Sequence, residues 1–108
     1  MSEREQLRRH LLALESELRR LKLWQPSPPS ADALASSEPF CVDTLSLSEW
    51  LQWLLIPRIN ALLDGQLPLP AGCNITALAE ESFKNEEQDC SRLIQLIGAI
   101  DASITRAD

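Results

Sequence analysis

Residues 48–63, SEWLQWLLIPRINALL, constrain the fold more than any other segment of this chain. On a helical wheel their apolar side chains cover almost the full circle, whereas a surface helix is apolar along one stripe only. In a chain of 108 residues with a net charge of −6, such a helix has to be surrounded by other segments or by a partner. The segment therefore predicts a buried central helix.

Local signals mark the ends of this helix. Ser46 followed three residues later by Glu49 forms a capping box, which predicts a helix start. Gly65 follows the last apolar residues and suits the left-handed position that closes a helix, so the helix is expected over 46–64. Pro57 lacks an N–H and predicts a kink within it.

Two further long helices are predicted from apolar side chains that recur every three or four residues. The first spans residues 3–23 and the last spans residues 86–105, with Glu86 and Glu87 at its start. The stripe of the first helix consists of Leu7, Leu11, Leu14, Leu18 and Leu21. The stripe of the last helix consists of Leu93, Ile97, Ile100 and Ile104.

The remaining segments complete a bundle. A short helix is expected over 75–84 with Asn74 as its cap, and proline-rich crossings are expected at 25–30 and 66–72. The stretch EPFCVDT has no second run to pair with as a strand, so it is interpreted as a loop lying on the core through Phe40 and Val42. The prediction is a single all-α domain, residues 1–108. It is an irregular bundle of about four helices around a buried, proline-kinked central helix.

The cysteines do not indicate a metal site. Cys41, Cys73 and Cys90 lie far apart without CxxC spacing, and His10 belongs to another segment. They are interpreted as small, semi-buried apolar residues, and neither a metal nor a cofactor is expected. The longest apolar run, 53–57, is too short to span a membrane. Because the N-terminus has no secretion signal, a cytoplasmic location is expected.

Charge is distributed unevenly along the chain. Residues 1–22 carry a net charge of +2 and residues 23–108 carry −8. The acidic body argues against direct nucleic-acid binding, which depends on neutralising phosphates. Only the basic face of the first helix could contact tRNA, and the alternative is a solvated face of ion pairs. Its residues are Arg8, Arg9, Arg19 and Arg20.

Arg58 is the residue of the central helix that most needs a partner. Its guanidinium stays charged, and its stem lies on the same helical line as Leu54 and Leu62. Two interpretations are open: an internal ion pair, with Asp43 as the first candidate and Asp64 as the second, or an anion supplied by a binding partner. Tryptophan and arginine are enriched at binding hot spots. The interaction candidates are therefore Trp50, Trp53, Arg58, Asp43 and Gln52.

Residues 38–70 resemble the bacterial YqcC-like family. The matching pattern consists of Pro39-Phe40, Asp43-Thr44, Glu49-Trp50-Leu51-Gln52-Trp53, Ile56-Pro57-Arg58, Leu62-Leu63-Asp64 and Pro68-Leu69-Pro70. The resemblance implies a multihelical fold with a buried central helix. Members have no characterised activity, so it supplies no catalytic residues. Their genes tend to lie beside that of a tRNA pseudouridine synthase, which implies an association with this enzyme.

No catalytic constellation is recognisable, since the one histidine is far in sequence from any cysteine. We therefore expect a non-catalytic protein-interaction or accessory module, with a tRNA pseudouridine synthase as the first candidate partner. One alternative is an accessory protein that contacts tRNA through the basic face of the first helix. Another is a structural protein that associates with itself, so a monomer and a homodimer both stay open. No association with membranes is expected.

Overall fold

The structure, a computed structural model, describes residues 2–70 and 74–107. Within these ranges the chain forms six α-helices and no strand, which confirms the all-α prediction. The helices are α1 (Glu3–Arg20), α2 (Ala31–Leu34), α3 (Leu47–Trp50), α4 (Ile56–Asp64), α5 (Ile75–Phe83) and α6 (Ser91–Ala107). None of them combines the length and the hydrophobicity that a membrane-spanning segment needs.

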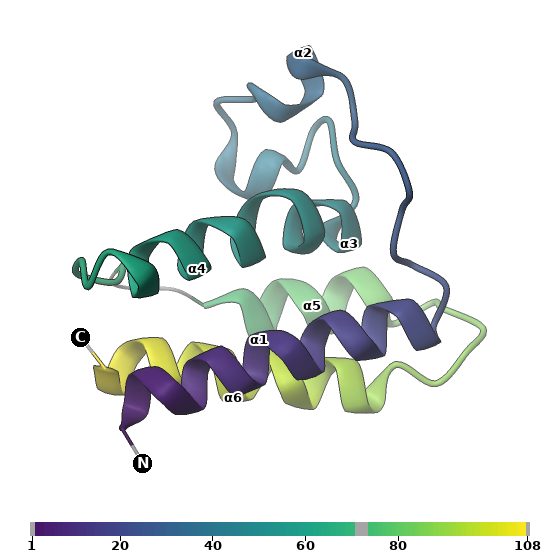
Figure 1. Cartoon of the computed structure of the whole chain (residues 1–108). Helices are drawn as coiled ribbons and strands as arrows, with labels where there is room; N and C mark the ends of the chain where they lie inside the picture. Colours follow the sequence, from purple (N-terminus) through teal and green to yellow (C-terminus); the bar gives the residue numbers. More distant parts are fainter. Residues whose placement is uncertain (1, 71–73, 108) are drawn as a thin grey trace.

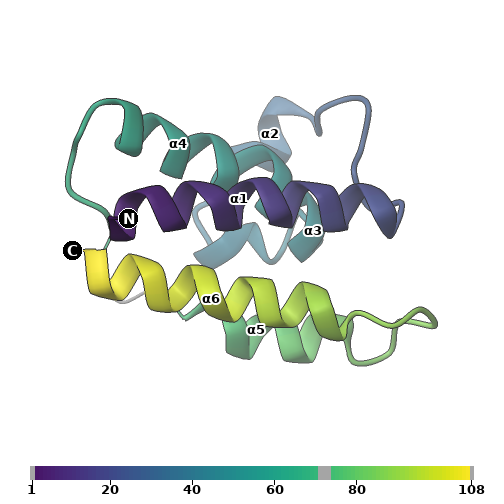
Figure 2. The ribbon, with the colours of Figure 1, turned by 60° about the horizontal axis from the view of Figure 1, so that its bottom comes forward.

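The helices α3 and α4 are parts of one continuous rod, residues 47–64, because a π-helical turn at Leu51–Leu55 joins them. Figures 1 and 2 show α1 and α6 side by side and antiparallel, with both chain ends at the same end of the molecule. The rod contacts α1 through α4 and contacts α5 through α3, and α6 contacts both α1 and α5. The segment that carries α2 lies beyond the rod, away from α6 (Figure 1).

Both predicted apolar stripes are confirmed as the centre of the bundle. Their side chains are at most 3% exposed, and they belong to one continuous core. In α1 and its C-terminal end they are Leu7, Leu11, Leu14, Leu18 and Leu21, and in α6 they are Leu93, Ile97, Ile100 and Ile104. Burial of apolar area of this kind is the main stabilising contribution to a small helical domain.

Burial of the rod is one-sided, whereas the sequence predicted a helix surrounded on all sides. The buried inner face consists of Leu47, Leu51, Leu55, Ile56, Ile59 and Leu63. On the outer face Trp50 and Leu54 are half-buried, while Pro57 and Arg58 are exposed. Trp53, which points to a neighbouring side, is also half-buried. A chain of this size has too few remaining segments to cover every side of an apolar helix.

The start of the rod follows the prediction, and its kink takes an unexpected form. Ser46 Oγ accepts a hydrogen bond from the Glu49 N–H at 3.3 Å, and Glu49 Oε1 accepts one from the Ser46 N–H at 2.8 Å, which is the predicted capping box. Further along, the Ile56 N–H donates to the carbonyl of Leu51, five residues back. The distortion before Pro57 is therefore a π turn, which places one extra residue in a helical turn.

Two helices end on residues in the left-handed conformation, and neither residue is glycine. Helix α1 ends at Arg20, earlier than predicted, because Lys22 has φ 62°. After the rod, Gln66 has φ 54°, whereas Gly65 has φ −85°, so the left-handed role predicted for Gly65 is wrong. A Cβ on Gly65 would lie 3.3 Å from the Leu67 side chain. Gly65 therefore serves to make space for Leu67.

Helix α6 starts later than predicted, whereas α5 starts at Ile75 as predicted but without the predicted cap. Helix α6 begins at Ser91, because the Asp89 carboxylate accepts hydrogen bonds from the Ser91 N–H at 2.9 Å and from its hydroxyl at 2.6 Å. Glu86 and Glu87, expected at the helix start, are exposed in the preceding turn. Asn74 precedes α5 but forms no side-chain cap.

The loop before the rod packs on the core through Phe40, as expected, and through Cys41 in place of Val42. A 3₁₀ turn at Pro39–Cys41 buries Cys41, which is 5% exposed, and Phe40 packs against the core. Val42 is 61% exposed, so the prediction that it covers the core is wrong. The crossing at 25–30 is non-helical as predicted, and so is the described part of the second crossing, 66–70.

Candidate functional site

The exposed outer face of the rod gathers several of the predicted interaction residues. Trp50, Leu54, Arg58 and Ala61 recur at intervals of three or four residues and therefore share one side of the helix. Arg58 and Ala61 are exposed on this side, and Leu54 and Trp50 are half-buried, with Trp50 packed against the core, so the side presents cationic, aliphatic and aromatic groups next to one another. Hydrophobic residues flanked by charge in this way are typical of interaction surfaces.

A hollow of about 370 Å³ runs along this face, and we call it the Arg58 groove. It is lined mainly by apolar side chains from the rod and from the segment 34–41, together with Pro70. Its lining includes Leu34, Glu38, Phe40, Trp50, Leu54 and Arg58. Phe40 packs edge-on against Trp50, with ring centroids 4.9 Å apart and an angle of 72° between the planes, so two aromatic rings form part of the wall.

Arg58 does not form either internal ion pair that the sequence suggested. Asp43 accepts a hydrogen bond from Ser36 Oγ at 2.5 Å, and Asp64 pairs with Arg8 at 2.8 Å. Within residues 2–70 and 74–107 the exposed guanidinium of Arg58 has no ion pair and no hydrogen bond. Neither internal ion pair suggested for Arg58 is therefore formed, and its charged group lies at the surface.

Trp53 and Gln52 lie on another side of the rod and take part in a polar network with the first crossing. Gln52, which is buried, accepts a hydrogen bond from the Gln25 N–H at 2.8 Å and donates to the Gln25 carbonyl at 2.7 Å. The Trp53 indole N–H donates to Gln25 Oε1 at 3.3 Å, and Gln25 Nε2 donates to Glu49 at 3.3 Å. Gln52 therefore holds the crossing on the rod, and its polar atoms are not free for a partner.

A second hollow, of about 620 Å³, borders this network. It includes Trp24, Trp53 and Arg19, and the guanidinium of Arg19 stacks over the Trp24 ring at 4.7 Å. The hydrogen bond from the Ser46 backbone lowers the pKa of Glu49, which anchors the other end of the network. This hollow is therefore edged by groups that already have partners within the chain.

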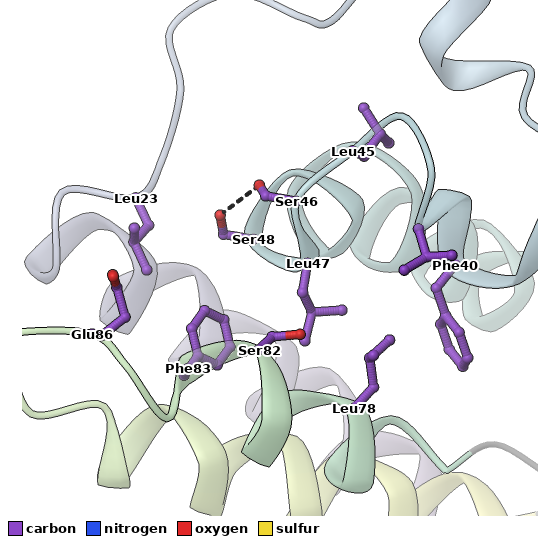
Figure 3. Close-up of a pocket in the computed structure, with 11 residues that line it drawn as sticks. Leu23, Phe40, Leu45, Ser46, Leu47, Ser48, Leu78, Ser82, Phe83 and Glu86 are labelled. Atoms are coloured by element: carbon purple, nitrogen blue, oxygen red, sulfur yellow. Dashed lines mark hydrogen bonds between the residues drawn. The ribbon is translucent and has the colours of Figure 1, made fainter.

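A third hollow, of about 520 Å³, opens between the start of the rod and α5, and sequence reasoning did not find it. Figure 3 shows Leu47 from the rod near Leu78 and Phe83 from α5, with Ser46 and Ser48 at one side. None of the predicted interaction residues lines it. No local motif marks this hollow, because it exists only where two helices distant in sequence meet.

The predicted RNA-facing arginines are mostly engaged within the chain. Arg8 pairs with Asp64 and donates to Asn60 Oδ1 at 3.2 Å. Arg19 pairs with Glu15 at 3.0 Å, and Arg20 forms two hydrogen bonds with Glu17, at 2.9 and 2.6 Å. Arg9 is exposed. The face is thus largely a set of ion pairs, which is the alternative the sequence left open.

Glu17 is the buried member of this set. It is 4% exposed, and the hydrogen bonds from Arg20 lower the pKa of its carboxyl group. Arg92 of α6 lies 4.0 Å from Glu17 Oε1, so the charge faces cations from two helices. A buried carboxylate with such partners stabilises the fold only while it is ionised.

We expect the effect of Glu17→Gln on stability to depend on pH. The folded-state pKa of Glu17 lies below its unfolded value of about 4.3, so ionised Glu17 stabilises the fold above that pH. This contribution is lost as the pH falls through the lowered pKa. Glu17→Gln should cost about 1–2 kcal/mol at neutral pH and progressively less below about pH 4.

The measurement is urea unfolding of both proteins across this pH range. Glu15→Gln serves as the control, because the Glu15–Arg19 pair lies on the surface, where ion pairs contribute about 0–1 kcal/mol. An equal effect of Glu17→Gln at neutral and at acidic pH would contradict the expectation.

The chemistry-bearing side chains of the described residues do not form a metal-binding cluster. Within residues 2–70 and 74–107, no three His, Cys, Asp or Glu side chains gather as ligands. Cys41 and Cys90 are free and more deeply buried than the semi-buried position predicted, and burial raises the pKa of the Cys90 thiol. Cys73 lies outside the described residues.

Comparison with known proteins finds a family model that matches most of this chain and several proteins of similar sequence. The sequence model of the family described as "DUF446: tRNA pseudouridine synthase C" matches residues 6–103. An uncharacterized protein of Haemophilus influenzae is 46% identical over 81 residues, which cover 75% of this chain and 76% of that protein. The uncharacterized protein YqcC of Escherichia coli is 32% identical over 102 residues, 94% of each chain.

The solution NMR structure of YqcC from Escherichia coli has the same fold, with a TM-score of 0.83 at 32% identity. The match covers 100% of this chain and 91% of that one. A protein of Pectobacterium carotovorum named tRNA pseudouridine synthase C is 39% identical over 88 residues. Those residues make up 82% of this chain but only 23% of the Pectobacterium protein.

Proposed function

This chain belongs to the DUF446 family, described as tRNA pseudouridine synthase C, and we propose that it is a non-catalytic accessory module that binds a tRNA pseudouridine synthase. The observation that carries the proposal is the match to the Pectobacterium protein named for that enzyme. Most of this chain corresponds to less than a quarter of that longer protein. In the Pectobacterium protein, a segment similar to this chain is therefore covalently joined to a larger part that this chain does not match.

Covalent joining keeps a segment close to the rest of its protein at high effective concentration. A separate chain of the same family would reach the same arrangement only by binding. The outer face of the rod supplies a surface for this, because Trp50, Leu54 and Arg58 are accessible together. Trp and Arg side chains at such faces contribute strongly to binding energy.

We assign the catalytic activity that the name denotes to the part of the Pectobacterium protein that this chain does not match. The hydroxyl–carboxylate pairs among the described residues have local structural roles: Asp89 caps the start of α6 through Ser91, and Asp101 binds Thr76 at the start of α5. His10 is half-buried on α1, a helix in which Arg8, Arg19 and Arg20 form ion pairs. These features support an accessory role.

The test is a binding experiment between this protein and the separately purified tRNA pseudouridine synthase C of the same organism. We expect a one-to-one complex with a Kd of about 10 µM or tighter by calorimetry, the range of a transient interface. Sedimentation of the protein alone identifies any homodimer. No complex at the highest soluble concentrations would contradict the proposal, and pseudouridine formed in tRNA by this protein alone would contradict the non-catalytic role.

A further inference from the structure

Among the described residues, three hollows have a mainly apolar lining, and they differ in the polar groups that edge them. The hollow between the rod and α5 has Glu86 and serines beside its apolar residues, and no basic residue lines it. The hollow beside Gln52 has Arg19, which already pairs with Glu15 and stacks on Trp24. The Arg58 groove joins an apolar lining to a cation that has no partner among the described residues.

The wall of the Arg58 groove opposite the rod is held in place by contacts within the chain. The Thr44 hydroxyl donates to the Ala33 carbonyl at 2.7 Å, and the Ser36 hydroxyl donates to Asp43 at 2.5 Å. Phe40 stands against Trp50 with φ 58°, a conformation that is uncommon for a bulky residue. Because the walls are fixed in the free protein, a docking segment would lose little free energy to ordering them.

Arg58 determines the sign of the charge that fits. Its guanidinium is permanently charged and offers a planar set of donors that matches a carboxylate. Its neighbours Leu54 and Trp50 supply apolar surface next to that charge. Glu38 also lines the groove but makes no ion pair with Arg58. A complementary ligand therefore carries a carboxylate directly beside an apolar side chain.

We infer that the Arg58 groove is the docking site for an acidic segment of the synthase, which places an Asp or Glu carboxylate on Arg58 and an adjacent apolar side chain against Trp50 and Leu54. The inference rests on the proposed function and adds the site and the chemistry of the partner segment. The volume of about 370 Å³ is at the small end of binding pockets, which run from roughly 300 to 1,000 Å³, so it suits anchoring side chains of a protein segment.

The test compares variants of this protein in binding to the purified synthase by calorimetry. Arg58→Glu should raise Kd about tenfold or more, and Arg58→Gln and Leu54→Ala should each raise it severalfold. Since Arg58 is exposed, both Arg58 variants should keep the helical circular dichroism and melting temperature of the unaltered protein. Leu54→Ala alters a half-buried side chain, so it should keep the helical circular dichroism with at most a small loss of stability. Binding should also weaken with added salt, and less so for Arg58→Gln.

Two controls identify the site and the sign of the charge. Arg9→Glu makes the same charge change at another exposed arginine and should leave Kd unchanged within about twofold. Glu38→Lys reverses the charge within the groove itself, and an acidic partner segment predicts equal or tighter binding. Conversely, a loss of binding in Glu38→Lys would indicate a basic segment and overturn the inference.

A charge-reversal scan of the synthase completes the test. One surface Asp or Glu of the synthase, changed to Arg, should restore binding to the Arg58→Glu variant, and failure of every such change contradicts a carboxylate as the partner of Arg58. If Arg58→Glu and Arg58→Gln bind as tightly as the unaltered protein, the groove is not the docking site although the proposed function stands. If the unaltered protein does not bind the synthase, both are wrong.

Discussion

We expect Leu51→Ala to lower the free energy of unfolding by about 3–4 kcal/mol, since truncation of buried leucines costs roughly 2–5 kcal/mol. Leu51 is 0% exposed and lies in the π turn on the inner face of the rod. The substitution removes most of a side chain from the continuous core and leaves a cavity that the surrounding side chains fill only in part. Urea unfolding followed by tryptophan fluorescence measures the change.

The matched control is Leu54→Ala, at the same residue type within the same helical turn. Leu54 is half-buried on the outer face, so its truncation should cost about 1 kcal/mol or less. The comparison therefore tests the one-sided burial of the rod directly. Equal losses at Leu51 and Leu54 would mean that the rod is enclosed on both sides, as the sequence alone had suggested.

Apolar periodicity predicted the helices well because it reflects short-range geometry. The stripe beginning at Leu7 and the stripe ending at Ile104 both proved buried, and each is visible from spacing alone. The capping box of Ser46 and Glu49 was equally predictable, since both partners lie within one turn. Features set by neighbours in sequence were thus accessible without a structure.

Complete burial of the rod was not a valid conclusion from its composition. An apolar side chain shows that burial is favourable, but it does not show that the chain has enough surface to supply it. Trp50 and Trp53 are large and carry a polar N–H, so partial exposure is ordinary for them. Arg58 can lay its stem on apolar surface while its charge stays in water.

The candidate site was predicted in its residues but not in its arrangement. Trp50 and Arg58 share one groove, whereas Trp53 and Gln52 belong to the network around Gln25 on another side. Asp43 was expected to neutralise Arg58, yet it bonds to Ser36 instead. Such choices between polar partners depend on loop geometry, which periodicity does not describe.

The cap of α5 also depends on a contact that periodicity does not describe, because Asp101 of α6 supplies it. The three helices with serine caps, at Ser2, Ser30 and Ser46, have cap ψ angles between 155° and 162°, which places the side-chain oxygen over the first turn. Asn74 has φ −136° and ψ 70°, and its side chain does not cap α5. The sequence suggested Asn74 only because its residue type is common at caps.

We expect Asp101→Ala to lower the free energy of unfolding by about 3 kcal/mol, because several charge-assisted hydrogen bonds are lost together. From α6, Asp101 accepts hydrogen bonds from the Ile75 N–H at 3.1 Å, from the Thr76 N–H at 2.8 Å and from the Thr76 hydroxyl at 2.5 Å. The carboxylate thus caps α5 and interacts favourably with the positive end of the α5 dipole. Its hydrogen bonds also connect α5 to α6. Urea unfolding is the measurement.

Two further variants separate the cap from a general loss of packing. Asp101→Asn keeps an acceptor oxygen but loses the charge, so it should cost about 1–2 kcal/mol. Adding Asn74→Ser to Asp101→Ala should restore nothing, because the backbone at Asn74 does not direct a side chain over the first turn. Recovery of stability in that double variant would show that α5 can be capped locally. In that case the α6 carboxylate is not what holds the start of α5.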